Sequence, residues 1–287
     1  MSDGGKGKQV KAHDAADVFE STLIAAAQLP GVRINRENFL RRSLKSRCDG
    51  KTLDAAITEG PAAAGIDKDV LLAVANNSIN YETAKATAIS TAAGIPGGLA
   101  MAGTVPADAA QYFGHVLRIA QKLAYLYNWP ELFSDEGEMD DATEGLLILF
   151  IGVMFGVESA STAIQRIAVV TARAVAQRLP QKALTKGIVY PTVKKVAVYL
   201  GYQMTKETFA KGVSKLVPVV GGIISGSLTF ATYRPMAARL RDYLAGLPIA
   251  DPEYYKAGMP ADVEVEAVVE EIFSEDDDVI DIEPEIE

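Results

Sequence analysis

The sequence contains few of the residues from which metal and redox sites are built. Its single cysteine, Cys48, cannot form an internal disulfide. The two histidines, His13 and His115, are too far apart for a metal-ligand spacing. We therefore expect no metal and no cofactor. The opening residues, MSDGGKGKQVKAH, lack the apolar stretch of a secretory signal, which favours a cytoplasmic protein.

The common catalytic motifs are also missing. The sequence contains no G-x-x-x-x-G-K-[ST] phosphate loop and no H-E-x-x-H pair. The string closest to G-x-S-x-G runs from Gly222 through Ser225 to Gly226, and it has one residue too many before the serine. These absences favour a protein that is not an enzyme.

Three segments lack charge, but each is a poor membrane span. Residues 86–107 are interrupted by Pro96 and by adjacent glycines, and residues 145–157 are apolar over only 13 positions. Residues 216–233 extend over 18 positions and contain three glycines and a proline. A spanning helix needs about 20 apolar residues, so we interpret all three as buried core helices. Insertion into a membrane under some conditions is the alternative.

The remaining pattern is helical, and no run alternates apolar and polar residues as a half-buried strand does. We predict an all-α, compact multi-helix bundle with long Gly/Ala-rich core helices. Proline, glycine and capping residues delimit the expected helices. These are residues 14–28, 36–48, 52–60, 67–93, 106–127, 143–178, 187–200, 206–216 and about 223–244.

Charge divides the chain into a body and a tail. Residues 251–287 contain fifteen Asp/Glu and one Lys, a net charge of −14. The first 250 residues contain 27 Lys/Arg and 22 Asp/Glu, a net charge of +5. We expect a disordered basic N-terminus (1–13), one helical domain (14–250) and an acidic, largely disordered tail (251–287). The tail either solubilises the protein or covers a basic surface of its own body.

Small residues recur four apart in the apolar segments, namely Gly152 with Gly156 and Gly222 with Gly226. A glycine has no side chain, so two helix backbones approach closely at such positions, in a membrane or in a soluble core. We interpret the four glycines as helix-packing positions.

Two stretches resemble a known family. TAAGIPGGLAMAGTVPADAAQYFGHVLRIAQKLAYLYNWPEL (91–132) is similar to the central signature of the EcsC protein family, in which a glycine-rich apolar hairpin leads to a Pro-x-Asp helix start. MTKETFAKGVSKLVPVVGGIISGSLTFATYRPMAARLRDYL (204–244) is similar to the C-terminal half of that family. The resemblance covers about residues 60–246. It implies a helical fold and a bacterial setting, and it implies no mechanism because the activity of the family is not established.

One helix face has a catalytic composition. Asp108, Tyr112, His115 and Lys122 fall within an arc of roughly 80° on the helix expected at 106–127. An aspartate one or two turns from a histidine can share its protons and fix its tautomer. An ordinary solvated helix face has the same composition, and that interpretation stays open.

Basic residues gather in two places. The short helix at 36–48 has a cationic face, and a second group precedes the acidic tail. The candidate membrane- or anion-binding residues are Arg36, Arg41, Arg42, Lys45, Arg47, Arg234, Arg239 and Arg241. Cationic amphipathic helices bind anionic membrane surfaces or acidic proteins. The modest net charge and the lack of a helix-turn-helix pattern disfavour nucleic acid.

Three hypotheses follow. The first is a non-enzymatic helical protein that acts at the cytoplasmic membrane surface or on a protein partner, with the acidic tail modulating access to the basic face. The second is an enzyme of unknown class that uses Asp108 and His115. The third is a conditional membrane inserter. The sequence does not specify the oligomeric state.

Overall fold

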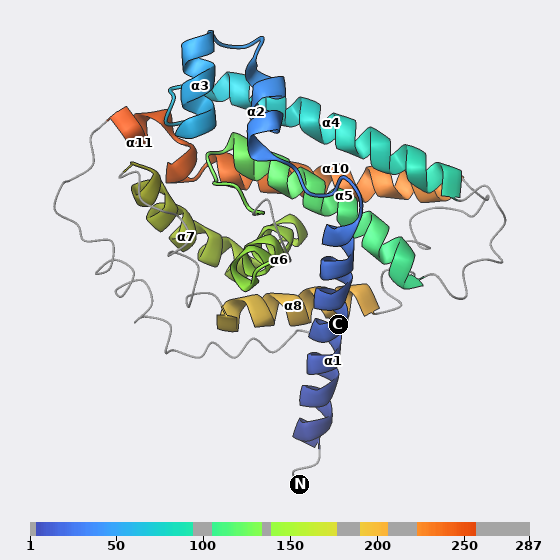
Figure 1. The fold of residues 1–287 in the computed structure, drawn as a ribbon. Coiled ribbons are helices and arrows are strands. Elements are labelled where there is room, and N and C mark those ends of the chain that lie inside the picture. The colour runs from blue at the N-terminus through green and yellow to red at the C-terminus, as the bar shows by residue number, and fades with distance from the viewer. Residues whose placement is uncertain (1–3, 94–104, 134–138, 177–189, 206–222, 257–287) are drawn as a thin grey trace.

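The computed structural model describes residues 4–93, 105–133, 139–176, 190–205 and 223–256. Within these ranges the regular structure is entirely helical, as the sequence predicts. Figure 1 shows the arrangement of the helices, with α1 (Gly4–Gln28) extending from one end of the molecule. The all-α prediction is confirmed.

Two long helices lie side by side, and a third helix packs against both. α4 (Lys68–Ala93) and α10 (Ile223–Ala245) are in contact along much of their length, and α5 (Val105–Leu126) packs against both (Figure 1). α1 packs against α5 and α8 (Tyr190–Thr205). These contacts bring residues near position 80 next to residues from the middle of α5 and from α10.

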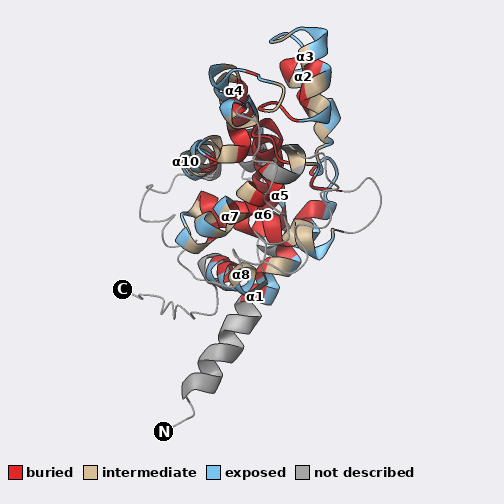
Figure 2. Cartoon of the chain, turned by 90° about the vertical axis from the view of Figure 1, so that its left-hand side faces the viewer, coloured by how far each residue is buried: buried red, intermediate tan, exposed pale blue. Residues whose placement is uncertain are grey.

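The centre of the molecule is α6 (Asp141–Phe155). Each of its residues from Gly145 to Met154 is buried, and α5, α7 (Glu158–Ala176), α8 and α10 all contact it (Figure 2). The rings of Phe150 and Trp129 meet edge to face at 5.1 Å between their centroids. The apolar run is therefore a core helix from residue 145 to residue 155, as expected for most of its length. In the described parts of the chain, no helix combines the length and the apolar character that crossing a membrane requires.

Side-chain caps begin several helices. Asn35 accepts a hydrogen bond from the backbone N–H of Asn38 and starts α2 (Arg36–Leu44). Asp49 accepts one from Thr52 and starts α3 (Gly50–Thr58). The helix expected at 36–48 is thus shorter than predicted, because Asp49 begins the next helix after a four-residue turn.

The single helix expected at 143–178 is wrong. The chain breaks at Gly156, whose φ of +81° ends α6 in the left-handed conformation that glycine adopts without strain. α7 begins at Glu158. A second boundary is also wrong, because Gly201 lies inside α8 and does not separate two helices. The helix expected at 206–216 lies outside the described residues.

Both ends of the body differ from the expected boundaries. α1 begins at Gly4, so most of the N-terminal segment expected to be disordered is helical. A 3-10 turn (Pro248–Ala250) and the short α11 (Pro252–Lys256) continue the fold past residue 250. Asn128 Nδ2 donates to the Tyr255 hydroxyl at 2.9 Å, which fastens α11 to the end of α5. The acidic tail therefore begins after Lys256.

Candidate functional site

The predicted catalytic face of α5 meets a carboxylate that the sequence analysis missed. Glu82 of α4 is fully buried, and its Oε1 lies 2.5 Å from Lys122 Nζ and 3.0 Å from Arg118 Nη2. His115 Nδ1 lies 3.7 Å from Glu82 Oε2, beyond hydrogen-bond distance. His115, Arg118 and Lys122 are separated by three and four residues, so they share the face of α5 that turns toward α4. We call these four residues the Glu82 cluster.

Direct contact with cations stabilises the ionised form of Glu82. Burial would raise the pKa of Glu82, but His115, Arg118 and Lys122 together hold that pKa well below its usual range. Burial lowers the pKa of Lys122, and the adjacent Glu82 carboxylate opposes that shift. Glu82 is therefore a carboxylate at neutral pH. Both of its oxygens are engaged by cations, so it is not placed to accept a proton as a general base.

Of the described residues of the predicted catalytic face, Tyr112 does not join His115 and Lys122 at the Glu82 carboxylate. The Tyr112 hydroxyl points to Met236 Sδ at 3.8 Å, and burial raises the pKa of Tyr112 to about 12. His115 and Lys122 are less than a tenth exposed, so this part of the face is not solvated. The side chain of Asp108 lies outside the described residues. Lys122 forms an ion pair between two packed helices, and His115 lies beside the same carboxylate.

A signal for Glu82 was present in the sequence. Buried Leu71, Ala75, Ile79 and Ala86 recur at helical spacing along α4, and Glu82 occupies the same stripe. A charged residue inside an apolar stripe requires a buried partner. The stripe identifies the carboxylate, but only the packing of α5 identifies its partners.

Two of the predicted anion-binding residues of α2 are used within the fold. Arg36 donates from Nε to the Trp129 carbonyl at 3.0 Å and from Nη1 to the Ile57 carbonyl at 2.6 Å. Arg41 pairs with Glu37 at 3.0 Å and with Asp54 at 3.6 Å. Arg36 joins α2 to two other segments, so it is not available to a ligand.

The other three basic residues of this region face solvent. Arg42, Lys45 and Arg47 are exposed, and no carboxylate of the described chain lies within 4.0 Å of their charged groups. The apolar residues Leu40 and Leu44 are fully buried against the body. α2 is therefore a docked helix, and the exposed cations are Arg42 within it and Lys45 and Arg47 in the turn that follows it. We call Arg42, Lys45 and Arg47 the α2 basic surface.

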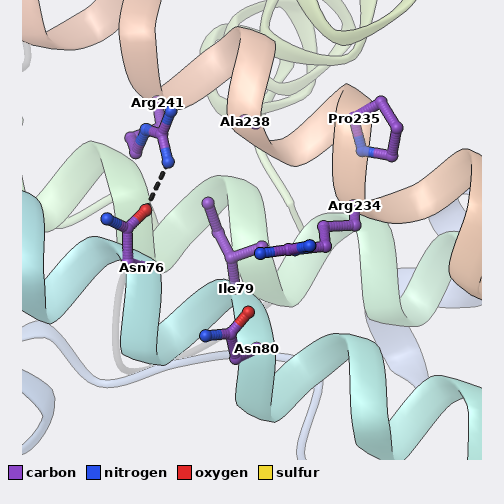
Figure 3. Close-up of a pocket in the computed structure, with 7 residues that line it drawn as sticks. All are labelled: Asn76, Ile79, Asn80, Arg234, Pro235, Ala238 and Arg241. Carbon is purple, nitrogen blue, oxygen red and sulfur yellow. Dashed lines mark hydrogen bonds between the residues drawn. The ribbon is translucent and has the colours of Figure 1, made fainter.

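The C-terminal basic residues also have different roles. Arg239 Nη1 donates to the Met154 carbonyl at 2.6 Å. This bond gives a partner to one of the last carbonyls of α6, which have none within the helix. Arg241 donates to Asn76 Oδ1 and pairs with Asp242 at 2.6 Å. Arg234 is exposed and lines a groove between α4 and α10 together with Arg241 (Figure 3).

The four predicted packing glycines have different positions. A Cβ on Gly152 would lie 2.6 Å from Ala160 Cβ and 2.8 Å from Val196 Cγ1, so α6 does approach its neighbours closely there. Gly156 is exposed and ends the helix. Gly226 belongs to α10, but its surroundings are not described, and Gly222 lies outside the described residues.

No group of three or more His, Cys, Asp or Glu in the described ranges is arranged to hold a metal ion. Comparison with protein-family models, with curated proteins and with solved structures gives no match to this chain. The resemblance to the EcsC family therefore stays a prediction.

Proposed function

We propose that this protein is a non-enzymatic helical protein that attaches to the anionic cytoplasmic surface of a membrane through the α2 basic surface. The observation that supports this is the exposure of Arg42, Lys45 and Arg47 without a carboxylate partner in the described chain. The other basic residues of α2 are engaged in internal contacts, so these three are the ones left to meet an external anion. The use of His115 and Lys122 inside the Glu82 cluster supports the non-enzymatic part of the proposal.

Attachment of this kind is electrostatic. A helix that inserts into the lipid interface does so with its apolar side, but Leu40 and Leu44 are already in the core. Each basic side chain close to an anionic leaflet contributes about 1 kcal/mol, so three give a weak and reversible attachment. Screening by salt shortens the reach of these charges to about 10 Å at 0.1 M, so binding should weaken steeply as salt rises.

The acidic tail competes with the membrane in this proposal. Residues 257–287 contain thirteen Asp/Glu and no Lys or Arg. Because the tail is covalently attached, its effective concentration near the body is in the millimolar range, which suffices to compete with a weak ligand. The full chain should therefore bind anionic lipid less tightly than a chain without the tail.

Liposome co-sedimentation tests both parts. The full chain and a chain ending at Lys256, which retains the contact between Tyr255 and Asn128, are mixed with neutral or anionic vesicles at low and high salt. The variant R42Q/K45Q removes two charges from the α2 basic surface. K194Q/K195Q removes two exposed charges from α8 and is the matched control.

We expect the chain ending at Lys256 to bind anionic vesicles at low salt and the full chain to bind them less. R42Q/K45Q should lose binding, whereas K194Q/K195Q should keep it. Equal losses in the two variants would show that net charge, not the α2 basic surface, determines binding. No binding by either chain length would overturn the membrane proposal and point to a protein partner.

A further inference from the structure

A groove runs between α4 and α10, on a different part of the molecule from α2 (Figures 1 and 3). Its volume is about 400 Å³. Polar residues from both helices line it, namely Asn76 and Asn80 of α4 and Arg234 and Arg241 of α10. Ile79, Pro235 and Ala238 form its apolar part. The described lining thus contains two cations, two amides and no carboxylate.

Arg241 is held in place before any ligand arrives. Its guanidinium donates to Asn76 Oδ1 and pairs with Asp242 Oδ1 at 2.6 Å, and its side chain is 19% exposed. A guanidinium has five N–H donors and these contacts use three of them, so Arg241 keeps donor capacity at the lining of the groove. The contact with Asn76 also fixes the amide of that residue. One wall of the groove is therefore preorganised.

Arg234 supplies the second cation. It lies seven residues before Arg241, which places the two Cα atoms about 10 Å apart along the same side of α10. Figure 3 shows the Arg234 side chain extending over α4 toward Ile79 and Asn80, not away from the groove. Arg234 is exposed, and no carboxylate of the described residues lies within 4.0 Å of its guanidinium. Among the described residues Arg234 thus has no counterion, and the guanidinium of Arg241 lines the same groove.

We propose that this groove binds a phosphate ester, with the phosphate group between Arg234 and Arg241 and the apolar part of the ester on Ile79, Pro235 and Ala238. Guanidinium groups recognise phosphate oxygens through paired N–H donors, more specifically than lysine does. A phosphate monoester has a charge of about −1.5 to −2 and three acceptor oxygens, which matches two guanidinium groups and the Asn80 amide. A planar carboxylate would pair with only one of the two guanidinium groups.

The ester has two possible sources with the same chemistry. One is a soluble phosphate monoester, and the other is a lipid with a phosphate headgroup. The inference does not rest on the proposed attachment through the α2 basic surface, because the two sites share no residue. Variants at each site therefore separate the two proposals.

The test uses the full chain in isothermal titration calorimetry at low salt. Inorganic phosphate and phenyl phosphate are the soluble probes, and vesicles containing phosphatidic acid are the lipid probe. R234Q removes the unpaired cation of the groove, and R42Q removes one charge from the α2 basic surface as the matched control. A238L fills the groove without changing its charge. Thermal melting of each variant verifies that the fold is retained.

We expect phenyl phosphate to bind more tightly than inorganic phosphate, because only phenyl phosphate reaches the apolar part of the groove. R234Q should weaken phenyl phosphate binding by about tenfold or more, as loss of a charge-assisted contact predicts. A238L should weaken phenyl phosphate more than inorganic phosphate, and R42Q should change neither. The lipid test uses the R42Q/K45Q background, which removes attachment through the α2 basic surface. If adding R234Q abolishes the remaining binding to phosphatidic acid vesicles, the source is a lipid. If it leaves that binding unchanged, or if no vesicle binding remains in this background, the source is a soluble ester.

Two results would overturn the inference. The first is the absence of saturable phenyl phosphate binding to the wild-type chain at millimolar concentration. The second is an equal effect of R234Q and R42Q in folded variants, which would mean that the probe responds to overall charge and not to the groove.

Discussion

Replacing Glu82 with glutamine is the most direct test of the Glu82 cluster. Glutamine has nearly the same volume and can still accept hydrogen bonds, but it removes the carboxylate that Arg118 and Lys122 contact at 3.0 and 2.5 Å. The side chains of these two cations are only 15% and 11% exposed, so water cannot fully replace the lost counterion. The variant isolates the charge from the packing.

The expected loss of stability follows from this burial. Removing one partner of a buried ion pair costs about 3–5 kcal/mol, and the residual exposure of both cations favours the lower end. We expect E82Q to lower the free energy of unfolding by about 3 kcal/mol and Tm by about 6–12 °C. Urea and thermal unfolding followed by circular dichroism measure both quantities. E37Q, which removes an exposed carboxylate paired with Arg41, should cost less than about 1 kcal/mol and is the control.

The same charge predicts a pH dependence. The pKa of Glu82 in the folded protein lies well below its ordinary value of 4.5, so the ionised carboxylate favours the folded state above that pH. This contribution is lost as the pH falls from about 4.5 toward the folded-state pKa. The difference in stability between wild type and E82Q should therefore be constant near neutral pH and shrink in acid. A difference below about 0.5 kcal/mol at pH 7, or one that grows in acid, would refute the reasoning.

Further substitutions test close contacts elsewhere in the fold. Helix propensity alone favours G152A by about 1 kcal/mol, but its Cβ would lie 2.8 Å from Val196, so we expect a net loss of about 1–3 kcal/mol in urea unfolding. G50A, where the added Cβ meets nothing within 4 Å, should not destabilise, and equal effects would contradict the close approach. N128A should cost about 2–4 kcal/mol, because Asn128 has a φ of +72° and its buried Oδ1 accepts a hydrogen bond from the backbone N–H of Ala62. Y255F removes a hydroxyl that accepts from Asn128 and donates to the Ile249 carbonyl, and it should cost about 1–2 kcal/mol by the same assay. A larger loss in Y255F than in N128A would contradict the role given to Asn128.

Helix boundaries marked by local chemistry were predictable from the sequence. Asn35 caps a helix as expected, and the helices expected at 67–93 and 106–127 differ from α4 and α5 by about one residue. The break at Gly156 was missed because the apolar pattern continues on both sides of it. Gly156 differs from Gly152, four residues earlier, in its backbone φ and in its exposure, and the sequence shows neither property. Amino-acid composition does not distinguish a glycine at which two helices pack closely from a glycine that ends a helix.

The site was predictable only in part, because its residues come together through packing. Periodicity placed His115 and Lys122 on one face of α5, but their partner Glu82 lies on another helix and more than 30 residues earlier. Composition selected the basic residues as candidates, but it did not show that Arg36 and Arg239 are used inside the fold. Which of them face outward depends on long-range contacts, such as that between Arg36 and the Trp129 carbonyl. Spacing along one helix contains no information on such contacts.

The central position of α6 has a consequence for synthesis of the protein. α5 precedes α6 in the chain, but α7, α8 and α10 follow it, and α10 ends only at Ala245. A ribosome adds about 5–20 residues per second, so roughly 5–20 s pass between completion of α6 and completion of its surroundings. During that interval α6, the most apolar of the described helices, lacks most of its neighbours. The order of helices therefore makes α6 the segment that a chaperone would bind during translation.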